Sequence, residues 1–166
     1  MTIRITGPES SGKTTLARAL AEKLGGVYVP EMARSYLEKR KGQYVYADLA
    51  AIWEAQSSAE DAARATGANY VICDTGPEVI CLWAEVKYGR CPAPVIRACA
   101  ERIYDQTLLC YPDLPWEPDP LRETPKLAER ISLFRRYEKI LEEYSIITGT
   151  NRLRSALSLI SNLTPP

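Results

Sequence analysis

Short apolar runs alternate along the chain with segments in which apolar residues recur at helical spacing. After the first run, apolar residues recur three or four positions apart from Leu16 to Leu24, which predicts a helix that ends at Gly25 and Gly26. The apolar runs predict strands at Met1–Thr6, Val27–Val29, Tyr70–Cys73, Gln106–Cys110 and Ser145–Thr148. The remaining periodic segments predict helices at Met32–Arg40, Ala47–Thr66, Pro77–Tyr88, Pro125–Glu143 and Asn151–Leu163.

The first predicted strand leads directly into GPESSGKT, which matches the phosphate-binding pattern G-x-x-x-x-G-K-[ST] in full. Glycines let the backbone turn its N–H groups toward phosphate oxygens, and the N-terminus of the following helix adds partial positive charge. Lys13 is predicted to reach the β- and γ-phosphates as a catalytic cation, and the Thr14 hydroxyl to hold Mg²⁺. The predicted ATP-binding residues of this loop are Gly7, Glu9, Ser10, Ser11, Gly12, Lys13, Thr14 and Thr15.

Strands that alternate with helices favour a parallel sheet covered on both faces. With the phosphate-binding loop after the first strand, they predict an α/β fold of the P-loop NTPase type. We expect a three-layer α/β/α arrangement with a five-stranded parallel sheet and a short lid. A length of 166 residues suits one domain, so we predict a single kinase-type domain over residues 1–166 with its lid at about 112–125.

Composition narrows the possible functions. Twenty-one basic and 21 acidic side chains cancel, so we expect no nucleic-acid partner. The chain has no histidine, which excludes serine-hydrolase triads and histidine-ligated metals. Its five cysteines form no CxxC pair, and we expect reduced, mostly buried thiols in a cytoplasmic protein. No apolar run approaches the roughly 20 residues of a membrane span, and the chain begins with a predicted strand rather than a signal peptide, so we expect no membrane partner.

Ligands of open α/β sheets bind beyond the carboxyl ends of the strands, so the residues that follow each strand are candidates for chemistry. Asp74 is predicted to be a catalytic and metal-handling carboxylate, and the alternative is an N-cap for the following helix. Glu31 could accept a proton from a substrate hydroxyl, or it could be a first-turn carboxylate favoured by the helix dipole. Arg34 would flank the same pocket, unless it is a solvated helix arginine.

The proline-rich segment from Tyr111 to Pro125 cannot be a helix interior or a central strand. A structured loop of this length favours a functional role. Arg122 is predicted to be a lid arginine that stabilises the charge of the transferring phosphoryl group, with a surface salt bridge as the alternative. Trp53, Trp83 and Trp116 are core or packing candidates, although Trp116 stands out because it lies in the lid.

These motifs together resemble the ribosylnicotinamide kinase domain of NadR-type NAD-biosynthesis proteins, a branch of the P-loop kinases. The resemblance covers nearly all 166 residues. It depends on the order and spacing of five stretches, of which only the first is highly specific by itself. These stretches are GPESSGKTTLARALA, PEMARSYL, CDTGPEVICLWAEVKYGRC, DLPWEPDPLRETP and ITGTNRLRSAL.

The resemblance implies an enzyme that phosphorylates nicotinamide riboside to nicotinamide mononucleotide with ATP and Mg²⁺. It places Trp116, Asp119 and Arg122 on the family's W-x-x-D-x-x-R lid pattern, and the loop with Asn151 and Arg152 near the adenine. A cationic nicotinamide ring suits an aromatic cage, so the predicted substrate-binding residues are Glu31, Arg34, Tyr36, Asp74, Trp83, Trp116 and Asp119. The adenylyltransferase signature H-x-G-H cannot occur in a chain without histidine.

Two positions depart from the family pattern. Gly76 stands where the family has the second acid of Asp-Thr-Asp, and Ser35 where it has the second acid of PE-x-x-RE. Three hypotheses therefore stay open: a ribosylnicotinamide kinase, a kinase for another nucleoside or nucleotide, and a non-catalytic ATP-binding regulator. The third predicts that Asp at position 76 and Glu at position 35 would restore activity. The sequence does not predict the oligomeric state.

Overall fold

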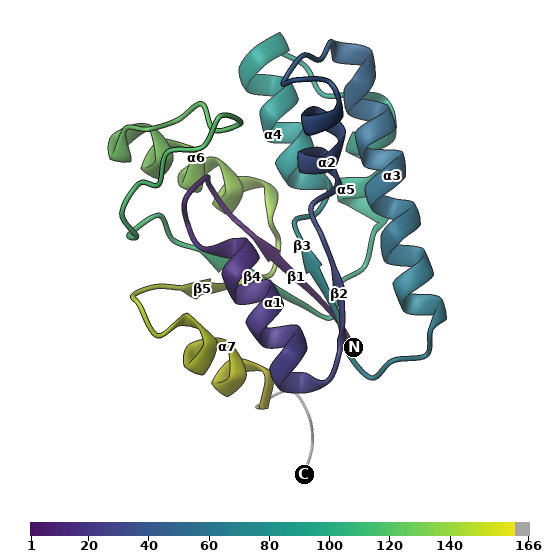
Figure 1. Ribbon diagram of the computed structural model, residues 1–166, viewed down its shortest axis with the longest axis vertical. Coiled ribbons are helices and arrows are strands. Elements are labelled where there is room, and N and C mark those ends of the chain that lie inside the picture. Colours follow the sequence, from purple (N-terminus) through teal and green to yellow (C-terminus); the bar gives the residue numbers. More distant parts are fainter. Residues whose placement is uncertain (162–166) are drawn as a thin grey trace.

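The computed structural model describes residues 1–161 and confirms the predicted α/β class (Figure 1). Five strands form one sheet in the order β2-β3-β1-β4-β5, and every neighbouring pair is parallel. The chain crosses from one side of β1 to the other between β3 and β4, so the loop after β1 lies at the point where an open parallel sheet binds ligands. The strands are β1 (Thr2–Thr6), β2 (Val27–Val29), β3 (Val71–Asp74), β4 (Gln106–Cys110) and β5 (Ser145–Ile147).

Helices cover both faces of the sheet. One face packs against α1 and α7 through a core that includes Ile3, Ile5 and Leu20. The opposite face packs against α3, α4 and α6 through two further clusters, and Figure 1 shows α2, α3, α4 and α5 grouped together at one end of the molecule. The helices are α1 (Lys13–Leu24), α2 (Met32–Lys39), α3 (Tyr46–Ala65), α4 (Pro77–Tyr88), α5 (Ala93–Glu101), α6 (Leu127–Ile140) and α7 (Arg152–Ser161).

The strand sequences explain where each side chain goes. Ile3 and Ile5 of β1 are fully buried in the cluster below α1 and α7, whereas Arg4 between them faces the opposite side, as strand alternation requires. All four residues of β3 are buried, which is typical of a central strand in a sheet covered on both faces. Each buried aliphatic side chain contributes roughly 1.5–3 kcal/mol to folding.

Helix α5 was not among the predicted helices. Pro92 and Pro94 made its beginning resemble a loop, but Pro92 is the N-cap and Pro94 lies in the first turn, where a missing N–H costs nothing. Helix α6 is shorter than the predicted Pro125–Glu143. The predicted end of the last helix at Leu163, like the last five residues of the predicted domain, lies outside the described residues.

The structure also bears on what the sequence predicts for the cysteines, for membrane spans and for the lid. All five cysteines are free thiols, and Cys73, Cys81 and Cys110 are buried. Within residues 1–161, no helix combines the length and the apolar character that crossing a membrane requires. The lid, residues 112–125, contains neither helix nor strand.

Candidate active site

The loop from Gly7 to Thr14 connects β1 to α1 in a tightly turned backbone. Gly7, Ser10 and Gly12 all have positive φ, at 134°, 53° and 77°. A Cβ at Gly7 would lie 2.5 Å from the carbonyl oxygen of Cys110 on β4, so only glycine fits there. The Ser11 hydroxyl donates to the Pro8 carbonyl at 2.7 Å and holds the turn. Successive turns of this kind direct N–H groups inward and form an anion-binding nest.

Lys13 lies at the first position of α1 and reaches back over the loop. Its Nζ donates to the Pro8 carbonyl at 2.8 Å, which keeps the cation above the nest. Burial raises the pKa of both Glu31 and Asp74, and the charge of Lys13 opposes both rises, so the lysine is electrostatically coupled to both carboxyl groups. The structure thus brings together the loop cation and the two carboxylates that the sequence selected.

Asp74 ends β3 as a fully buried side chain. The Tyr28 hydroxyl donates to its Oδ2 at 3.1 Å, while its Oδ1 is buried without a hydrogen-bond partner. Burial raises the pKa of the Asp74 carboxyl, and the neighbouring Thr14 hydroxyl and Lys13 oppose that rise. The capping alternative fails, because the N-cap of α4 is Gly76 and α4 has no side-chain cap.

Thr14 and Asp74 provide suitable ligands for Mg²⁺. The unpartnered Oδ1 of Asp74 is a hard oxygen whose burial would be costly without a cation or donor nearby. Mg²⁺ commonly takes one or two protein oxygens and completes its shell with water and substrate phosphates. Among residues 1–161, no group of three or more acidic or cysteine side chains could hold a metal alone. The residues therefore fit a Mg²⁺ ion that binds together with a nucleotide.

Glu31 occupies the N-cap position of α2, directly after β2. Its side chain makes no capping hydrogen bond to α2 and lines the central cavity instead. Burial raises the pKa of the Glu31 carboxyl, and the charges of Lys13 and Arg34 act in the opposite direction. A carboxylate with a raised pKa that faces a cavity is suited to accept a proton from a bound hydroxyl.

The lid lies against the phosphate-binding loop. Arg122 donates from Nη1 to the Ser10 hydroxyl at 2.9 Å, and the Glu9 carboxylate accepts the backbone N–H groups of Glu123 and Thr124 at 3.1 and 2.9 Å. The salt-bridge alternative for Arg122 is weak, because its contact with the Glu117 carboxylate is 4.0 Å long. Arg122 thus contacts the phosphate-binding loop directly.

A second attachment joins the lid to α2. Arg34 donates from Nη2 to Asp119 at 2.9 Å, and the pKa of Asp119 is lowered by the Leu121 backbone N–H and by Arg34. Arg34 lines the cavity as predicted, and Asp119 anchors the lid to Arg34.

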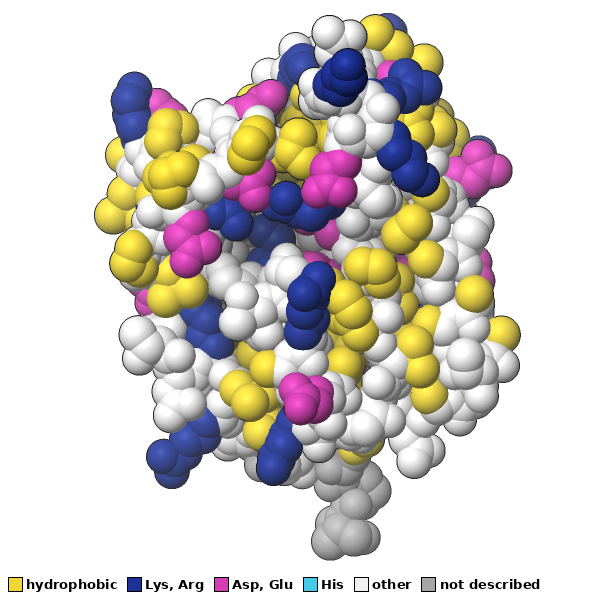
Figure 2. Space-filling view, viewed as in Figure 1, with side chains coloured by type: hydrophobic (Ala, Val, Ile, Leu, Met, Phe, Trp, Pro, Cys, Tyr) yellow, Lys and Arg dark blue, Asp and Glu magenta, His cyan; other side chains and the backbone are white. Residues whose placement is uncertain are grey.

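The loop, α2, α4 and the lid enclose a cavity of about 640 Å³. Figure 2 shows the hollow in the view of Figure 1, with basic side chains deep inside and acidic side chains near its rim. Its far end is aromatic, because the rings of Tyr44 and Trp83 lie 4.4 Å apart between centroids, and Lys87 lies 3.6 Å from the centroid of the Tyr44 ring. Trp83 was predicted, whereas Tyr44 was missed because it lies in the irregular segment between α2 and α3.

Several predicted contacts require correction. The Tyr36 hydroxyl donates to Asp48 at 2.7 Å, so that bond turns Tyr36 toward α3 and away from the cavity lining. Trp116 does not line the cavity either, because its ring lies between the guanidinium groups of Arg122 and Arg130, 5.9 and 5.5 Å away. Trp53, by contrast, is buried in the core, as packing predicted.

The two residues predicted to lie near the adenine differ in their positions relative to the cavity. Asn151 is exposed and absent from the cavity lining. Arg152 lines the cavity, but its guanidinium donates to the carbonyls of Ile147 and Tyr111 at 2.8 and 2.9 Å and pairs with Asp113. Its observed role is therefore to tie the loops after β4 and β5 together.

The two departures from the family pattern have structural explanations. A Cβ at Gly76 would lie 2.5 Å from Cδ of Arg4 and 2.7 Å from Oε2 of Glu78, so this pair fills the space of a side chain. Ser35 donates to the Met32 carbonyl within α2 at 3.0 Å and does not line the cavity. Neither position offers space in the cavity for the missing acid.

We therefore expect Gly76→Asp to lower the free energy of unfolding by about 1–3 kcal/mol, because the added atoms overpack a filled site. Chemical denaturation measures the change, with Gly76→Ala as the smaller step in the same direction. An undiminished stability for Gly76→Asp would show that Arg4 and Glu78 move aside freely.

Comparisons with known proteins agree with this geometry. A family model described as an AAA domain matches residues 2–149. The chain belongs to this AAA-domain family. No curated protein matches this AAA-domain protein in sequence.

Solved structures share the fold of this AAA-domain protein. NadR protein in complex with NR is similar, with a TM-score of 0.75, 21% identity, and coverage of 97% of this chain and 50% of NadR. Thymidylate kinase from Ehrlichia chaffeensis is similar with a TM-score of 0.64, 17% identity and 99% and 98% coverage. Shikimate kinase from Acinetobacter baumannii is similar with a TM-score of 0.54, 18% identity and 98% and 91% coverage. The AAA-domain protein thus spans about half the length of the NadR chain, and its fold is that of P-loop kinases of small molecules.

Proposed function

We propose that the protein is an ATP-dependent phosphotransferase that acts on a small nucleoside, with nicotinamide riboside as the leading acceptor. The observation that carries this proposal is one cavity lined by Lys13, Glu31 and Arg122, with Asp74 buried beside Thr14 and Lys13. Kinase catalysis depends on positioning and charge stabilisation more than on covalent chemistry. These groups provide both.

Each group has a separate role in the proposed reaction. The loop N–H groups and Lys13 bind the β- and γ-phosphates of ATP, and Thr14 and Asp74 hold Mg²⁺, which neutralises phosphate charge when bound. Glu31 accepts the proton of the acceptor hydroxyl, because burial raises its pKa and it lines the same cavity as the loop and the aromatic pair. Arg122 stabilises the charge on the transferring phosphoryl group and excludes water through the lid.

We propose that a flat, positively charged ring binds at the acceptor end on the Trp83 side, because Lys87 already lies over the Tyr44 ring. Tyr44 and Trp83 supply aromatic surface, and Glu31 supplies negative charge. A cationic ring gains about 0.5–2 kcal/mol from an aromatic face. Because the two rings contact each other, the acceptor would stack on the exposed face of the pair rather than between them. The fold shared with NadR in complex with NR supports the same acceptor.

The function is tested by coupled ADP release from ATP and Mg²⁺ with a panel of acceptors. The panel contains nicotinamide riboside, an uncharged nucleoside, thymidine monophosphate and shikimate. We expect the strongest stimulation with nicotinamide riboside. Stimulation by another member alone would support a kinase with a different acceptor. Folded, ATP-binding protein that none of them stimulates would support a non-catalytic, ATP-binding regulator.

We propose the cytoplasm as the location of the protein and Mg²⁺ as its metal.

Trp83→Ala should raise the KM for nicotinamide riboside about 5- to 30-fold, because it removes one aromatic face from the acceptor end. The KM for ATP should change little, since Trp83 lies on α4 away from the loop. Steady-state kinetics in both substrates measure the difference, and Trp83→Phe should recover most of the loss. Equal effects of Trp83→Ala on both KM values would contradict this placement of the acceptor.

A further inference from the structure

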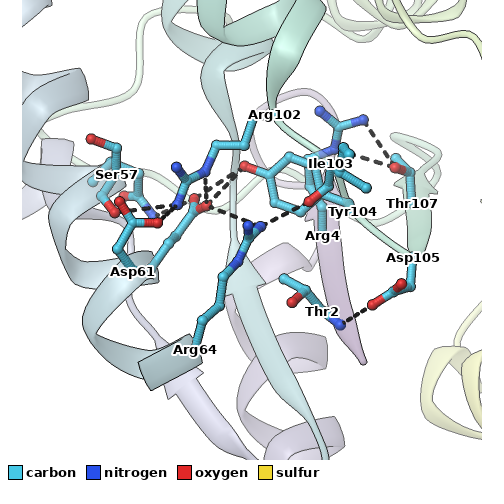
Figure 3. Close-up of polar contacts among 12 residues, drawn as sticks. Thr2, Arg4, Ser57, Asp61, Arg64, Arg102, Ile103, Tyr104, Asp105 and Thr107 are labelled. Atoms are coloured by element: carbon cyan, nitrogen blue, oxygen red, sulfur yellow. Dashed lines mark hydrogen bonds and ion pairs between the residues drawn. The ribbon is translucent and has the colours of Figure 1, made fainter. Parts of the chain in front are cut away.

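A buried ionic network lies behind the cavity, around Glu60 of α3. Glu60 is fully buried and does not line the cavity. Its carboxylate accepts hydrogen bonds from Arg102 Nε at 2.6 Å, the Tyr104 hydroxyl at 3.0 Å and Gln56 Nε2 at 3.4 Å. Figure 3 shows the side chains of Arg102 and Tyr104 close together. A buried ion pair contributes little net stability compared with apolar packing. Stability therefore does not explain this network, and we look for its role in the residues that it contacts.

One arm of the network reaches the turn after β2. Gln56 is 2% exposed, and its Oε1 accepts the backbone N–H of Met32 at 2.9 Å. This N–H is at the first position of α2, where a helix provides no partner of its own. The hydrogen bond from Gln56 Nε2 to Glu60 orients the amide so that its oxygen faces Met32. Met32 directly follows Glu31, so this arm holds the backbone next to Glu31, the proposed base.

The other arm reaches the turn after β3. The guanidinium of Arg4 lies 4.4 Å from the centroid of the Tyr104 ring. Arg4 also donates to Glu78, a side chain with 1% exposure, at 2.7 Å. Both side chains lie against Gly76, two residues beyond Asp74. Figure 3 shows Arg4 beside Tyr104 and Thr107, and close to the cluster around Arg102.

This second turn contains a strained residue. Thr75 has a φ of 85°, which is unfavourable for a β-branched residue. Its N–H donates to the Ile5 carbonyl at 2.9 Å. Such strain persists only where the surroundings enforce it, and the buried pair of Arg4 and Glu78 packs directly against this turn.

We propose that Glu60 is a positioning residue that holds the turns carrying Glu31 and Asp74 at a fixed separation, through Gln56 on one side and Tyr104 with Arg4 on the other. The network connects the start of α2, next to Glu31, with the turn that follows Asp74. Glu31 lines the cavity, whereas Asp74 is buried beside Thr14 and Lys13. The expected effect of Glu60 on catalysis rests on the proposed function. Its expected effect on the order of the two turns does not.

The proposal is tested with Glu60→Gln, which replaces an acceptor oxygen with an amide that faces donors, and with Gln56→Leu, which leaves the ion pair in place. Asp61→Asn is the matched control, because exposed Asp61 pairs with the same Arg102 at 2.7 Å from the solvent side. Hydrogen exchange at the Met32 and Thr75 amides reports the order of the two turns, and kinetics with ATP and nicotinamide riboside report catalysis.

For Gln56→Leu we expect amide exchange about tenfold faster at Met32 and unchanged at Thr75, because only the first arm is cut. For Glu60→Gln, if it folds, we expect exchange about tenfold faster in both turns. We also expect kcat about tenfold lower and a KM for ATP within about twofold of the wild-type value. Asp61→Asn should change neither. Unchanged exchange at Met32 in Gln56→Leu, unchanged exchange at Thr75 in folded Glu60→Gln, or a kcat loss no greater than that of Asp61→Asn, would overturn the proposal. A wild-type protein without turnover would overturn the proposed function, and exchange alone would then decide whether Glu60 couples the two turns.

Discussion

Replacing Lys13 with alanine should lower the turnover of the proposed reaction about a thousandfold or more while the fold stays intact. The side chain supplies the charge that offsets negative charge on the transferring phosphoryl group, and losses of this size are typical of such groups. Within residues 1–161, the side chain makes one hydrogen bond, from Nζ to the Pro8 carbonyl at 2.8 Å. This bond is half-buried, so its loss lowers the free energy of unfolding by about 1 kcal/mol at most. Coupled ADP release measures turnover, and thermal unfolding measures stability.

Lys23→Ala is the matched control for this variant. Lys23 lies on the same helix, α1, but in its last turn and exposed to solvent. Its substitution should leave turnover unchanged within about twofold, because a surface charge a helix length away contributes little. If Lys13→Ala and Lys23→Ala had equal activity, the phosphate-binding role of the loop would be refuted.

Replacing Asp74 with asparagine has opposite effects on activity and stability. Asp74 Oδ1 is the buried oxygen without a partner beside Thr14, and an amide cannot replace its charge toward Mg²⁺. We therefore expect kcat to fall about 100-fold or more. The Mg²⁺ concentration that gives half-maximal activity should rise as well.

The stability effect follows from the direction of the pKa shift. Burial raises the pKa of Asp74 in the folded protein above its ordinary value, so the folded state binds this proton more tightly than the unfolded state. The contribution of Asp74 to the free energy of unfolding is therefore largest below the ordinary carboxyl pKa, and it falls as pH rises through the interval up to the raised pKa. Above that interval the buried charge destabilises the protein, so Asp74→Asn should be more stable than wild type at neutral pH without ligand.

Denaturant unfolding at neutral and acidic pH tests this result. The stability difference between Asp74→Asn and wild type should shrink as pH decreases, whereas Glu54→Gln, at an exposed position of α3, should show no such change. A loss of stability for Asp74→Asn at neutral pH would mean that the carboxylate is stabilised by its surroundings rather than held there for function.

The chemistry of the donor side could be predicted from the sequence because it is local. The loop residues are contiguous, and the carboxyl ends of parallel strands must meet at one edge, which brings Asp74 and Glu31 to the loop. The five strands could also be predicted from the sequence, because buried parallel strands are short apolar runs. Helix α5 was hidden only because its prolines fall at the first turn.

The acceptor side could not be predicted in the same way because it depends on tertiary packing. Tyr44 reaches the cavity from an irregular segment, and nothing local distinguishes it from Tyr36, which turns toward Asp48. Trp83 and Trp116 are equally aromatic in sequence, yet only Trp83 lines the cavity. The space at Gly76 is filled by Arg4, a residue more than 70 positions away in the chain.

The most direct test of the proposed reaction follows the phosphoryl group itself. ATP labelled in its γ-phosphoryl group is incubated with the protein, Mg²⁺ and nicotinamide riboside, and the labelled species are separated. We predict that the label moves to the hydroxyl of the riboside with wild-type protein and does not move with Lys13→Ala. Label that stays in ATP or appears only as free phosphate, with folded and nucleotide-bound wild-type protein, would contradict the proposed ribosylnicotinamide kinase activity.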